Sequence, residues 1–281
     1  MRTLFVFVLI FSINFLSGQK MITYKKIDKT DLKMMIFKPP GFDTHKKYKA
    51  IVFFFGGGWT KGNAAQFRSQ AVYFASKGLV CFLPDYRVAS RNQTTPFEAL
   101  KDAKSAIRFI KQNAAQLHID SARIVAAGGS AGGQLAAATA LIADYNEKTD
   151  NLKISSVPNA LILFNPVIDN GPGGYGFERI GEAYLHFSPL HNIRKGAPPT
   201  LIMLGRKDHL IPVATAEYYK TVMEKVGSRC DLALYDNAGH GFFNQNKNND
   251  NPFYQETLNE AERFLNALGY LTANSKTGSA N

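Results

Sequence analysis

Residues 123–133 read Arg-Ile-Val-Ala-Ala-Gly-Gly-Ser-Ala-Gly-Gly. The apolar half predicts a buried strand, and the alanine-rich run at 131–143 predicts a buried helix. Between them lies Ser130 in the pattern G-x-S-x-G, which is typical of the sharp strand-to-helix turn called a nucleophile elbow. Bulky residues two positions before or after Ser130 would collide with the adjoining strand and helix. We therefore take Ser130 as the first candidate for a catalytic residue.

Short apolar segments and amphipathic segments alternate over most of the chain. Strands are predicted at residues 23–28, 33–38, 51–55, 79–83, 123–127, 160–164, 200–204 and 231–235. Helices are predicted at residues 64–77, 96–116, 131–143, 213–226 and 254–268. This alternation predicts an α/β fold with a mostly parallel sheet of about eight strands and helices on both faces. No internal repeat or linker divides the chain, so we predict one domain over residues 19–271.

Both ends of the chain differ from this domain in composition. Residues 1–18 combine a basic start, an apolar core too short to span a bilayer and a small-residue end, which is typical of a secretory signal peptide. A membrane anchor is the weaker interpretation. We therefore expect a secreted or periplasmic protein without stable membrane insertion after signal cleavage. Residues 272–281 are small and polar and are expected to form a flexible tail.

The composition disfavours several classes of partner. The 281 residues carry a formal net charge of +11, but the lysines are scattered and no basic run is interleaved with aromatic residues. Nucleic-acid binding is therefore not expected. No group of cysteine and histidine has the spacing of a zinc site. The only two cysteines, Cys81 and Cys230, lie in predicted strands, and the sequence leaves open whether they pair after export.

A serine nucleophile needs a base, and His240 is the strongest candidate. It lies in a glycine-flanked loop directly after the predicted strand at 231–235, where a side chain reaches the carboxyl edge of the sheet. The order serine, acid, histidine along the chain is that of hydrolases built on this type of sheet.

The acid that orients this histidine is expected between the two, also after a strand. Asp208 follows the predicted strand at 200–204, and Asp169 is the alternative. Asp236 lies only four residues before His240, too close in the chain to fold back onto it. Capping of the next helix is the competing interpretation of Asp208.

A triglycine, residues 56–58, follows the apolar strand at 51–55. Glycine lets backbone N–H groups point into a pocket, so we expect Gly57 and Gly58 to help form an oxyanion hole. The N–H of Ala131, at a helix N-terminus, is the expected partner donor. A phosphate-binding loop is disfavoured because no G-K-[ST] ending follows the glycines.

Residues 165–197 interrupt the strand–helix rhythm with glycine, proline and aromatic residues. Such a segment is either a lid over the site or a surface excursion. Trp59 and the aromatic residues of this segment are candidates to stack on sugar rings, and packing against the core is the alternative. The aromatic residues in question are Tyr175, Phe177, Tyr184 and Phe187.

Four motifs in this order resemble the α/β-hydrolase superfamily, and within it the secreted bacterial esterase/lipase group that includes acetyl-xylan and feruloyl esterases. They are Phe55–Trp59, the Ser130 elbow, Gly205–Pro212 and Gly239–Phe242. The resemblance runs from about residue 33 to residue 270. It departs from the family pattern at Phe55, where the family usually has a histidine that braces the oxyanion loop.

The resemblance implies a carboxylic-ester hydrolase that works through an acyl-enzyme. It gives Ser130 the role of nucleophile, His240 that of base and then acid, and Asp208 that of holding the histidine. The oxyanion would be received by the amides of Ala131, Gly57 and Gly58. No metal or cofactor is implied.

An exported esterase that removes short acyl groups, above all acetyl, from a carbohydrate is the leading hypothesis. Two alternatives are a serine peptidase of the prolyl-oligopeptidase type and a degenerate hydrolase that acts as a binding protein. The first shares the triad order, although its family usually adds a propeller domain. The substitution at Phe55 is the one feature that favours the second.

Overall fold

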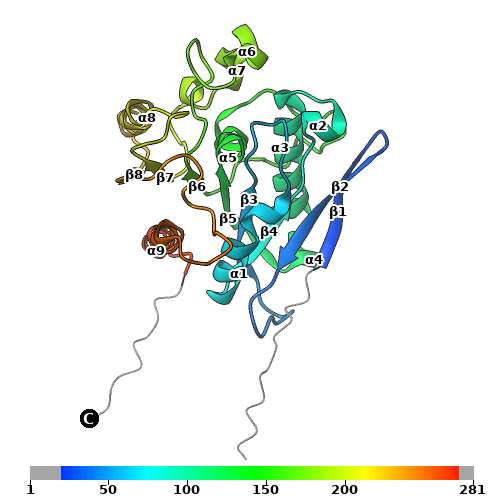
Figure 1. Cartoon of the computed structure of the whole chain (residues 1–281). Helices are drawn as coiled ribbons and strands as arrows, with labels where there is room; N and C mark the ends of the chain where they lie inside the picture. The colour runs from blue at the N-terminus through cyan, green and yellow to red at the C-terminus, as the bar shows by residue number, and fades with distance from the viewer. Residues whose placement is uncertain (1–19, 272–281) are drawn as a thin grey trace, which may run out of the picture.

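The computed structural model describes residues 20–271 (Figure 1). The predicted signal peptide and the predicted tail at 272–281 lie outside the described residues. Eight strands form one sheet in the order β1-β2-β4-β3-β5-β6-β7-β8. Their bounds are β1 Lys20–Ile27, β2 Thr30–Phe37, β3 Tyr48–Phe54, β4 Val80–Pro84, β5 Ile119–Gly129, β6 Ala160–Phe164, β7 Thr200–Gly205 and β8 Cys230–Tyr235.

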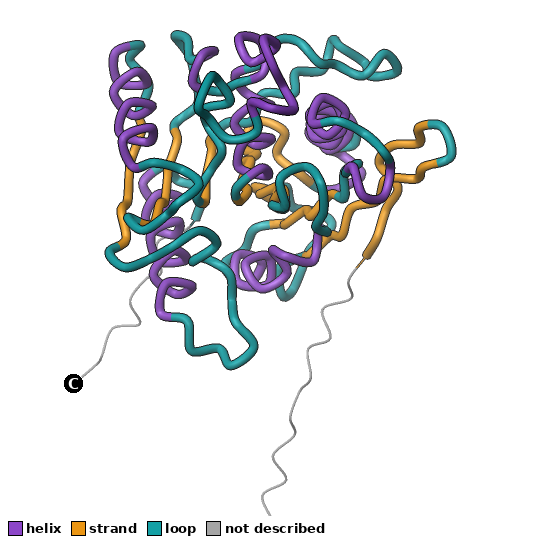
Figure 2. Tube along the Cα trace, turned by 45° about the horizontal axis from the view of Figure 1, so that its top comes forward, coloured by secondary structure: helices purple, strands orange, loops and turns teal. Residues whose placement is uncertain are grey.

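The sheet is parallel except at one side. β1 and β2 pair antiparallel, as do β2 and β4, and the pairs from β4 to β8 are all parallel. Figure 2 shows the β1–β2 hairpin extending from the side of the molecule. The predicted fold class, a mostly parallel sheet of about eight strands, is confirmed.

Helices cover both faces of the sheet. The longer ones are α1 Arg68–Ser76, α3 Pro96–Gln112, α5 Ala131–Leu141, α8 Val213–Lys225 and α9 Pro252–Ala267. Figure 1 shows α1 and α9 below the sheet and α3, α5 and α8 above it. An ion pair of 3.0 Å between Lys77 Nζ, just after α1, and Glu262 of α9 ties the lower pair together.

Shorter elements complete the fold. They are η1 Ala64–Phe67, α2 Ala89–Asn92, α4 Ala114–Leu117, α6 Phe177–Ile180, η2 Gly181–Ala183, α7 Tyr184–Phe187 and η3 Leu190–Asn192. The helix predicted over 96–116 begins where expected, because Thr95 and Glu98 form a capping box before Pro96. It ends four residues early, at Gln112, and α4 then adds a single turn.

The strand order reverses at β3, since β4 follows it on one side and β5 on the other. Such a reversal opens a crevice at the carboxyl ends of the strands, where ligands bind in α/β proteins. The buried parts of both strands are apolar, as expected for the centre of a sheet covered on both faces. The crevice therefore lies between the glycines after β3 and Ser130 after β5.

The two cysteines do not pair. Cys81 lies in β4 and Cys230 in β8, both thiols are buried, and four strands lie between them. Five inter-strand spacings correspond to roughly 24 Å, far beyond the Cα separation that a disulfide spans. Across residues 20–271, no helix combines the length and apolar character needed to cross a membrane.

Candidate active site

Ser130 occupies a strained turn between β5 and α5. Its φ of 54° and ψ of −120° are rare for a residue with a side chain, and they project that side chain from the tip of the turn. Glycine is required on both sides of Ser130 because a larger side chain there would collide with the backbone. A Cβ at Gly128 would lie 2.2 Å from the carbonyl oxygen of Gly132, and one at Gly132 would lie 2.1 Å from that of Phe54. The elbow geometry expected from the sequence is therefore present.

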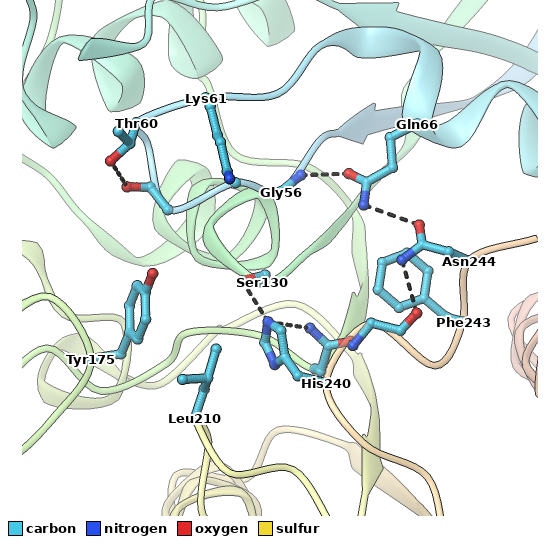
Figure 3. A pocket seen from close by; sticks show the side chains of 14 residues that line it. Gly56, Thr60, Lys61, Gln66, Ser130, Tyr175, Leu210, His240, Phe243 and Asn244 are labelled. Atoms are coloured by element: carbon cyan, nitrogen blue, oxygen red, sulfur yellow. Dashed lines mark hydrogen bonds between the residues drawn. The ribbon is translucent and has the colours of Figure 1, made fainter. Parts of the chain in front are cut away.

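The structure brings the three predicted triad residues together. Ser130 Oγ lies 2.9 Å from His240 Nε2, and His240 Nδ1 lies 2.8 Å from Asp208 Oδ2. Figure 3 shows the histidine side chain directed at the serine. A base within hydrogen-bond reach of a serine hydroxyl is able to take its proton.

Asp208 is held as a carboxylate. Its side chain is fully buried, and Oδ1 accepts hydrogen bonds from the N–H groups of Leu210 (2.9 Å) and Ile211 (3.0 Å). Burial by itself raises the pKa of this carboxyl, but the hydrogen bonds from His240 and from these two amides outweigh it and lower the pKa. A buried anion at Nδ1 fixes the imidazole tautomer and favours the imidazolium.

Gly57 and Gly58 line the same cavity as Ser130. Their φ values of 120° and 63° are left-handed, so the triglycine bends sharply after β3. The Gly57 carbonyl accepts the N–H groups of Thr60 and Lys61, at 3.1 Å each. Within the described part of the chain, the N–H groups of Gly57 and Gly58 have no acceptor. Ala131 is the first residue of α5, so its N–H has no intrahelical acceptor either.

The cavity above Ser130 has a volume of about 470 Å³, within the range of small-molecule sites. Tyr175 and Leu210 lie on one side of Ser130, and Gln66, Asn244 and Phe243 lie on the other (Figure 3). Apolar walls with a few polar groups are typical of a pocket for a small organic ligand.

Trp59 does not contribute to this cavity. It is only 1% exposed, and its ring packs 6.0 Å from the rings of Tyr175 and Phe187. The expectation that Trp59 stacks on a substrate is therefore wrong. Its φ of 59° is left-handed, and its side chain packs in the core against two aromatic residues of the segment 165–197. From that segment, Tyr175 reaches the cavity instead.

Asp169, the alternative acid, and Asp236 lie elsewhere. Asp169 accepts a hydrogen bond from the Gly171 N–H at 2.8 Å and lies 3.8 Å from His191. Asp236 is largely exposed and pairs with Arg206 at 2.9 Å. Neither contacts His240. Among residues 20–271, no group of three or more His, Cys, Asp or Glu side chains is arranged to hold a metal ion.

Comparison with known proteins agrees with this geometry. The BD-FAE family model matches residues 34–172, and the dienelactone hydrolase family model matches residues 175–269. A structure of Thermogutta terrifontis esterase 2 phosphoramylated by tabun is 44% identical, with a TM-score of 0.87. The match covers 92% of this chain and 97% of that one.

The chain belongs to the α/β-hydrolase esterases. A structure of the same Thermogutta esterase with propionate bound is 43% identical to this chain, with a TM-score of 0.86. The structure with butyrate bound is 42% identical, with a TM-score of 0.87. Each match covers 92% of this chain and 97% of that one. The acetylxylan esterase of Xylanibacter ruminicola is 26% identical over 241 residues, 79% of this chain and 46% of its own length. The chain spans about half the length of the curated relatives it matches.

Sequence reasoning missed three amide side chains of this esterase site. Asn165 is fully buried, its Nδ2 lies 3.3 Å from His240 Nε2, and its Oδ1 accepts the Gly241 N–H at 3.2 Å. Gln66 and Asn244 connect to each other at 3.0 Å. Asn165 directly follows β6, so the rule that found Asp208, a polar residue after a parallel strand, would have found it too. Gln66 and Asn244 carry no comparable signal.

Proposed function

We propose that this esterase hydrolyses short-chain carboxylic esters, above all acetyl esters carried by a carbohydrate, through an acyl-enzyme on Ser130. One observation carries the proposal. An uninterrupted hydrogen-bonded line from Asp208 through His240 to Ser130 ends in a cavity that is also lined by Gly57 and Gly58, whose N–H groups have no acceptor among the described residues. That set of groups meets each requirement of acyl transfer: nucleophile, base, orienting anion and oxyanion donors.

In the first half-reaction, Ser130 Oγ attacks the ester carbonyl carbon while His240 Nε2 takes the hydroxyl proton. The carbonyl oxygen becomes an oxyanion, which the amides of Gly57, Gly58 and Ala131 receive. The buried carboxylate of Asp208 stabilises the imidazolium formed at the same moment. His240 then gives its proton to the departing alcohol oxygen, and the acyl group remains on Ser130.

In the second half-reaction, the histidine takes a proton from water, and the resulting hydroxide equivalent attacks the acyl carbon. The same amides receive the second oxyanion. Collapse of this intermediate releases the carboxylic acid, and His240 returns the proton to Ser130 Oγ. Only residues of this chain and water are used in these steps.

A short acyl group fits the dimensions and lining of the cavity. Besides the glycines and polar residues, the cavity is lined by three large hydrophobic or aromatic residues, Tyr175, Leu210 and Phe243. This is enough apolar surface for a few methylene groups. The propionate and butyrate bound to the related Thermogutta esterase support the same size class.

The polar residues of the cavity and a related protein support a carbohydrate as the alcohol part of the ester. Thr60 and Lys61 line the cavity and offer a hydroxyl and an ammonium group suited to bind sugar hydroxyls. The related Xylanibacter protein is named an acetylxylan esterase. Because the Xylanibacter and Thermogutta relatives are both named esterases, they favour ester over peptide substrates, and we do not advance the peptidase alternative.

The signal peptide predicted at residues 1–18 supports export of this enzyme. Fractionation of the native host, with N-terminal sequencing of the recovered protein, tests this part. A mature N-terminus near residue 19 in the periplasm or medium is expected. An intact N-terminus in the cytoplasm would contradict it.

Acyl release from acetylated xylan, mannan and pectin tests the substrate and the mechanism together. We expect acetate release from at least one glycan, with a loss of about 10⁴-fold or more in Ser130→Ala. Equal release by the wild type and Ser130→Ala would exclude the mechanism. Turnover of p-nitrophenyl acetate without release from any glycan would exclude the carbohydrate substrate alone.

A further inference from the structure

Two loops line the cavity beside Ser130. The glycine loop, residues 56–62, supplies the unpaired amides of Gly57 and Gly58. The histidine loop, residues 237–245, carries His240. The ester carbonyl must meet both loops at once, and misplacement by about 1 Å is enough to cost roughly 10²-fold in rate.

The first peptide unit of the glycine loop is held from both sides. The Phe55 carbonyl oxygen accepts a hydrogen bond of 2.6 Å from the Tyr86 hydroxyl. The N–H of the same peptide unit, on Gly56, donates to Gln66 Oε1, also at 2.6 Å. The orientation of this unit sets the position of the next one, whose N–H belongs to Gly57.

Gln66 extends this contact to the histidine loop. Its Nε2 donates to Asn244 Oδ1 at 3.0 Å, across 178 residues of sequence. Asn244 Nδ2 donates to the Gly241 carbonyl oxygen at 2.8 Å. Figure 3 shows these bonds along one wall of the cavity, beside Phe243.

The chain of hydrogen bonds continues to the base itself. The Gly241 N–H donates to Asn165 Oδ1 at 3.2 Å, and Asn165 Nδ2 lies 3.3 Å from His240 Nε2. Hydrogen bonds therefore link Gly56 to the two peptide units on either side of the Gly241 Cα, and from there through Asn165 to the nitrogen that faces Ser130. Gln66 and Asn244 each accept at the side-chain oxygen and donate from the side-chain nitrogen, so these two amides polarise and orient one another.

We propose that Gln66 is a positioning residue that fixes the glycine loop relative to the histidine loop, so that oxyanion donors and base meet the same carbonyl group. This inference rests on the proposed function. Gln66 acts through Gly56 and Asn244 and takes no part in bond making. Loss of its amide leaves the Gly57 and Gly58 donors present but free to shift.

The structure offers a matched control nearby. Ser69 in α1 forms a side-chain hydrogen bond with Gln245, so it also links this helical region to the histidine loop, but it does not touch the glycine loop. Gln70 Nε2 donates to the Phe243 carbonyl oxygen at 3.2 Å. These two links remain when Gln66 is changed, so Gln66→Met is expected to fold with the histidine loop still attached to α1.

The test measures kcat and KM on p-nitrophenyl butyrate for the wild type, Gln66→Met, Asn244→Leu, the double variant and Ser69→Ala. For Gln66→Met we expect kcat to fall about 10- to 100-fold, less than or comparable to deletion of an oxyanion donor, with KM changed less than threefold. Ser69→Ala is expected to stay within twofold of the wild type. The double variant is expected to lose no more than the worse single variant, since one break already disconnects the path.

Three results would overturn the proposal: kcat of Gln66→Met within threefold of the wild type, an equal loss in Ser69→Ala, or a double-variant loss equal to the product of the two single losses. Thermal unfolding of each variant identifies any loss of activity that comes from unfolding. Gln66→Glu keeps an acceptor for the Gly56 N–H, so its kcat should lie between those of Gln66→Met and the wild type. Wild-type turnover that disappears in Ser130→Ala establishes the proposed function independently of Gln66. Absence of that turnover would be a failure of the proposed function.

Discussion

Phe55 and Tyr86 stack face to face, with ring centroids 3.9 Å apart and an interplanar angle of 10°. Both side chains are fully buried, and the Tyr86 hydroxyl donates to the carbonyl oxygen of the residue on which its ring lies. Burial raises the pKa of Tyr86 well above its usual value, so the hydroxyl remains a donor throughout the physiological pH range. At the position where related esterases usually have a histidine, this chain supports the start of the glycine loop with an aromatic pair.

Replacing Tyr86 with phenylalanine keeps the stack and removes the hydrogen bond. The Phe55 carbonyl then stays buried without that partner, which costs about 1–3 kcal/mol of unfolding free energy. We also expect kcat to fall several-fold with KM unchanged, because the glycine loop loses one of the two bonds on its first peptide unit. Denaturant unfolding and steady-state kinetics on p-nitrophenyl butyrate measure the two effects.

Tyr24→Phe is the matched control for this substitution. The Tyr24 hydroxyl also donates to a backbone carbonyl, that of Asp85 at 2.7 Å, but it does not touch the glycine loop. It should lose stability and keep kcat. A drop in kcat of the same size in both variants would show that Tyr86 acts through general stability alone.

Gly132→Ala tests the steric requirement of the elbow. The added Cβ would lie 2.1 Å from the Phe54 carbonyl oxygen and 2.3 Å from that of Phe55, so α5 must move away from β3. We expect a loss of about 2–4 kcal/mol in stability and at least 100-fold in kcat, by analogy with overpacking and displaced nucleophiles. Ala140→Gly changes the same helix by one methyl group without a collision and is expected to cost only about 1 kcal/mol, with kcat retained.

The elbow was predictable from sequence because its requirement is local. Small residues at 128 and 132, an apolar strand before them and a helix after them all lie within residues 123–143. The sheet was predictable for a related reason: β3 and β6 are apolar runs, which the centre of a parallel sheet requires. Asp208 and His240 follow strands, and parallel strands deliver such residues to one edge.

The features that the sequence did not reveal depend on contacts between distant segments. Trp59 follows the glycines as a substrate-binding aromatic residue would, and only its packing against Tyr175 and Phe187 shows that it lies in the core. Gln66 and Asn244 are separated by 178 residues, and an amide pair leaves no period or spacing in a single sequence. The early end of α3 at Gln112 is a boundary shift that the helical pattern of the sequence does not mark.

The carboxylate of Asp208 makes both activity and stability sensitive to acid. Its pKa is lowered in the folded protein, so its stabilising interactions are fully present above the unfolded-state pKa of about 4 and are lost as pH falls through the lower, folded value. The difference in unfolding free energy between the wild type and Asp208→Asn should therefore be largest near neutral pH and shrink below about pH 4. Urea unfolding of both proteins from pH 3 to pH 7 measures it.

The same substitution affects catalysis at neutral pH. Without the anion at Nδ1, the imidazole tautomer changes and the imidazolium is no longer stabilised, so kcat of Asp208→Asn should fall by about 10⁴-fold with a small change in KM. Asp169→Asn is the control, since Asp169 does not contact His240, and it should keep kcat within a few-fold. An equal loss in the two variants would contradict the assignment of Asp208 as the orienting acid.

The length of the acyl chain that the enzyme accepts follows from the walls of the cavity. Tyr175 and Leu210 lie on one side of Ser130 and Phe243 on the other, so these side chains limit the room for an acyl chain longer than a few carbons (Figure 3). On p-nitrophenyl esters from acetate to octanoate, we expect kcat/KM to be highest between acetate and butyrate and to fall steeply beyond. Tyr175→Ala removes one wall and should reduce this preference. Longer acyl chains then enter the vacated space, and each methylene buried there contributes about 0.8 kcal/mol to binding. Equal kcat/KM on octanoate and butyrate in the wild type would show that the acyl group lies elsewhere, and an unchanged profile in Tyr175→Ala would exclude this side chain as the limit.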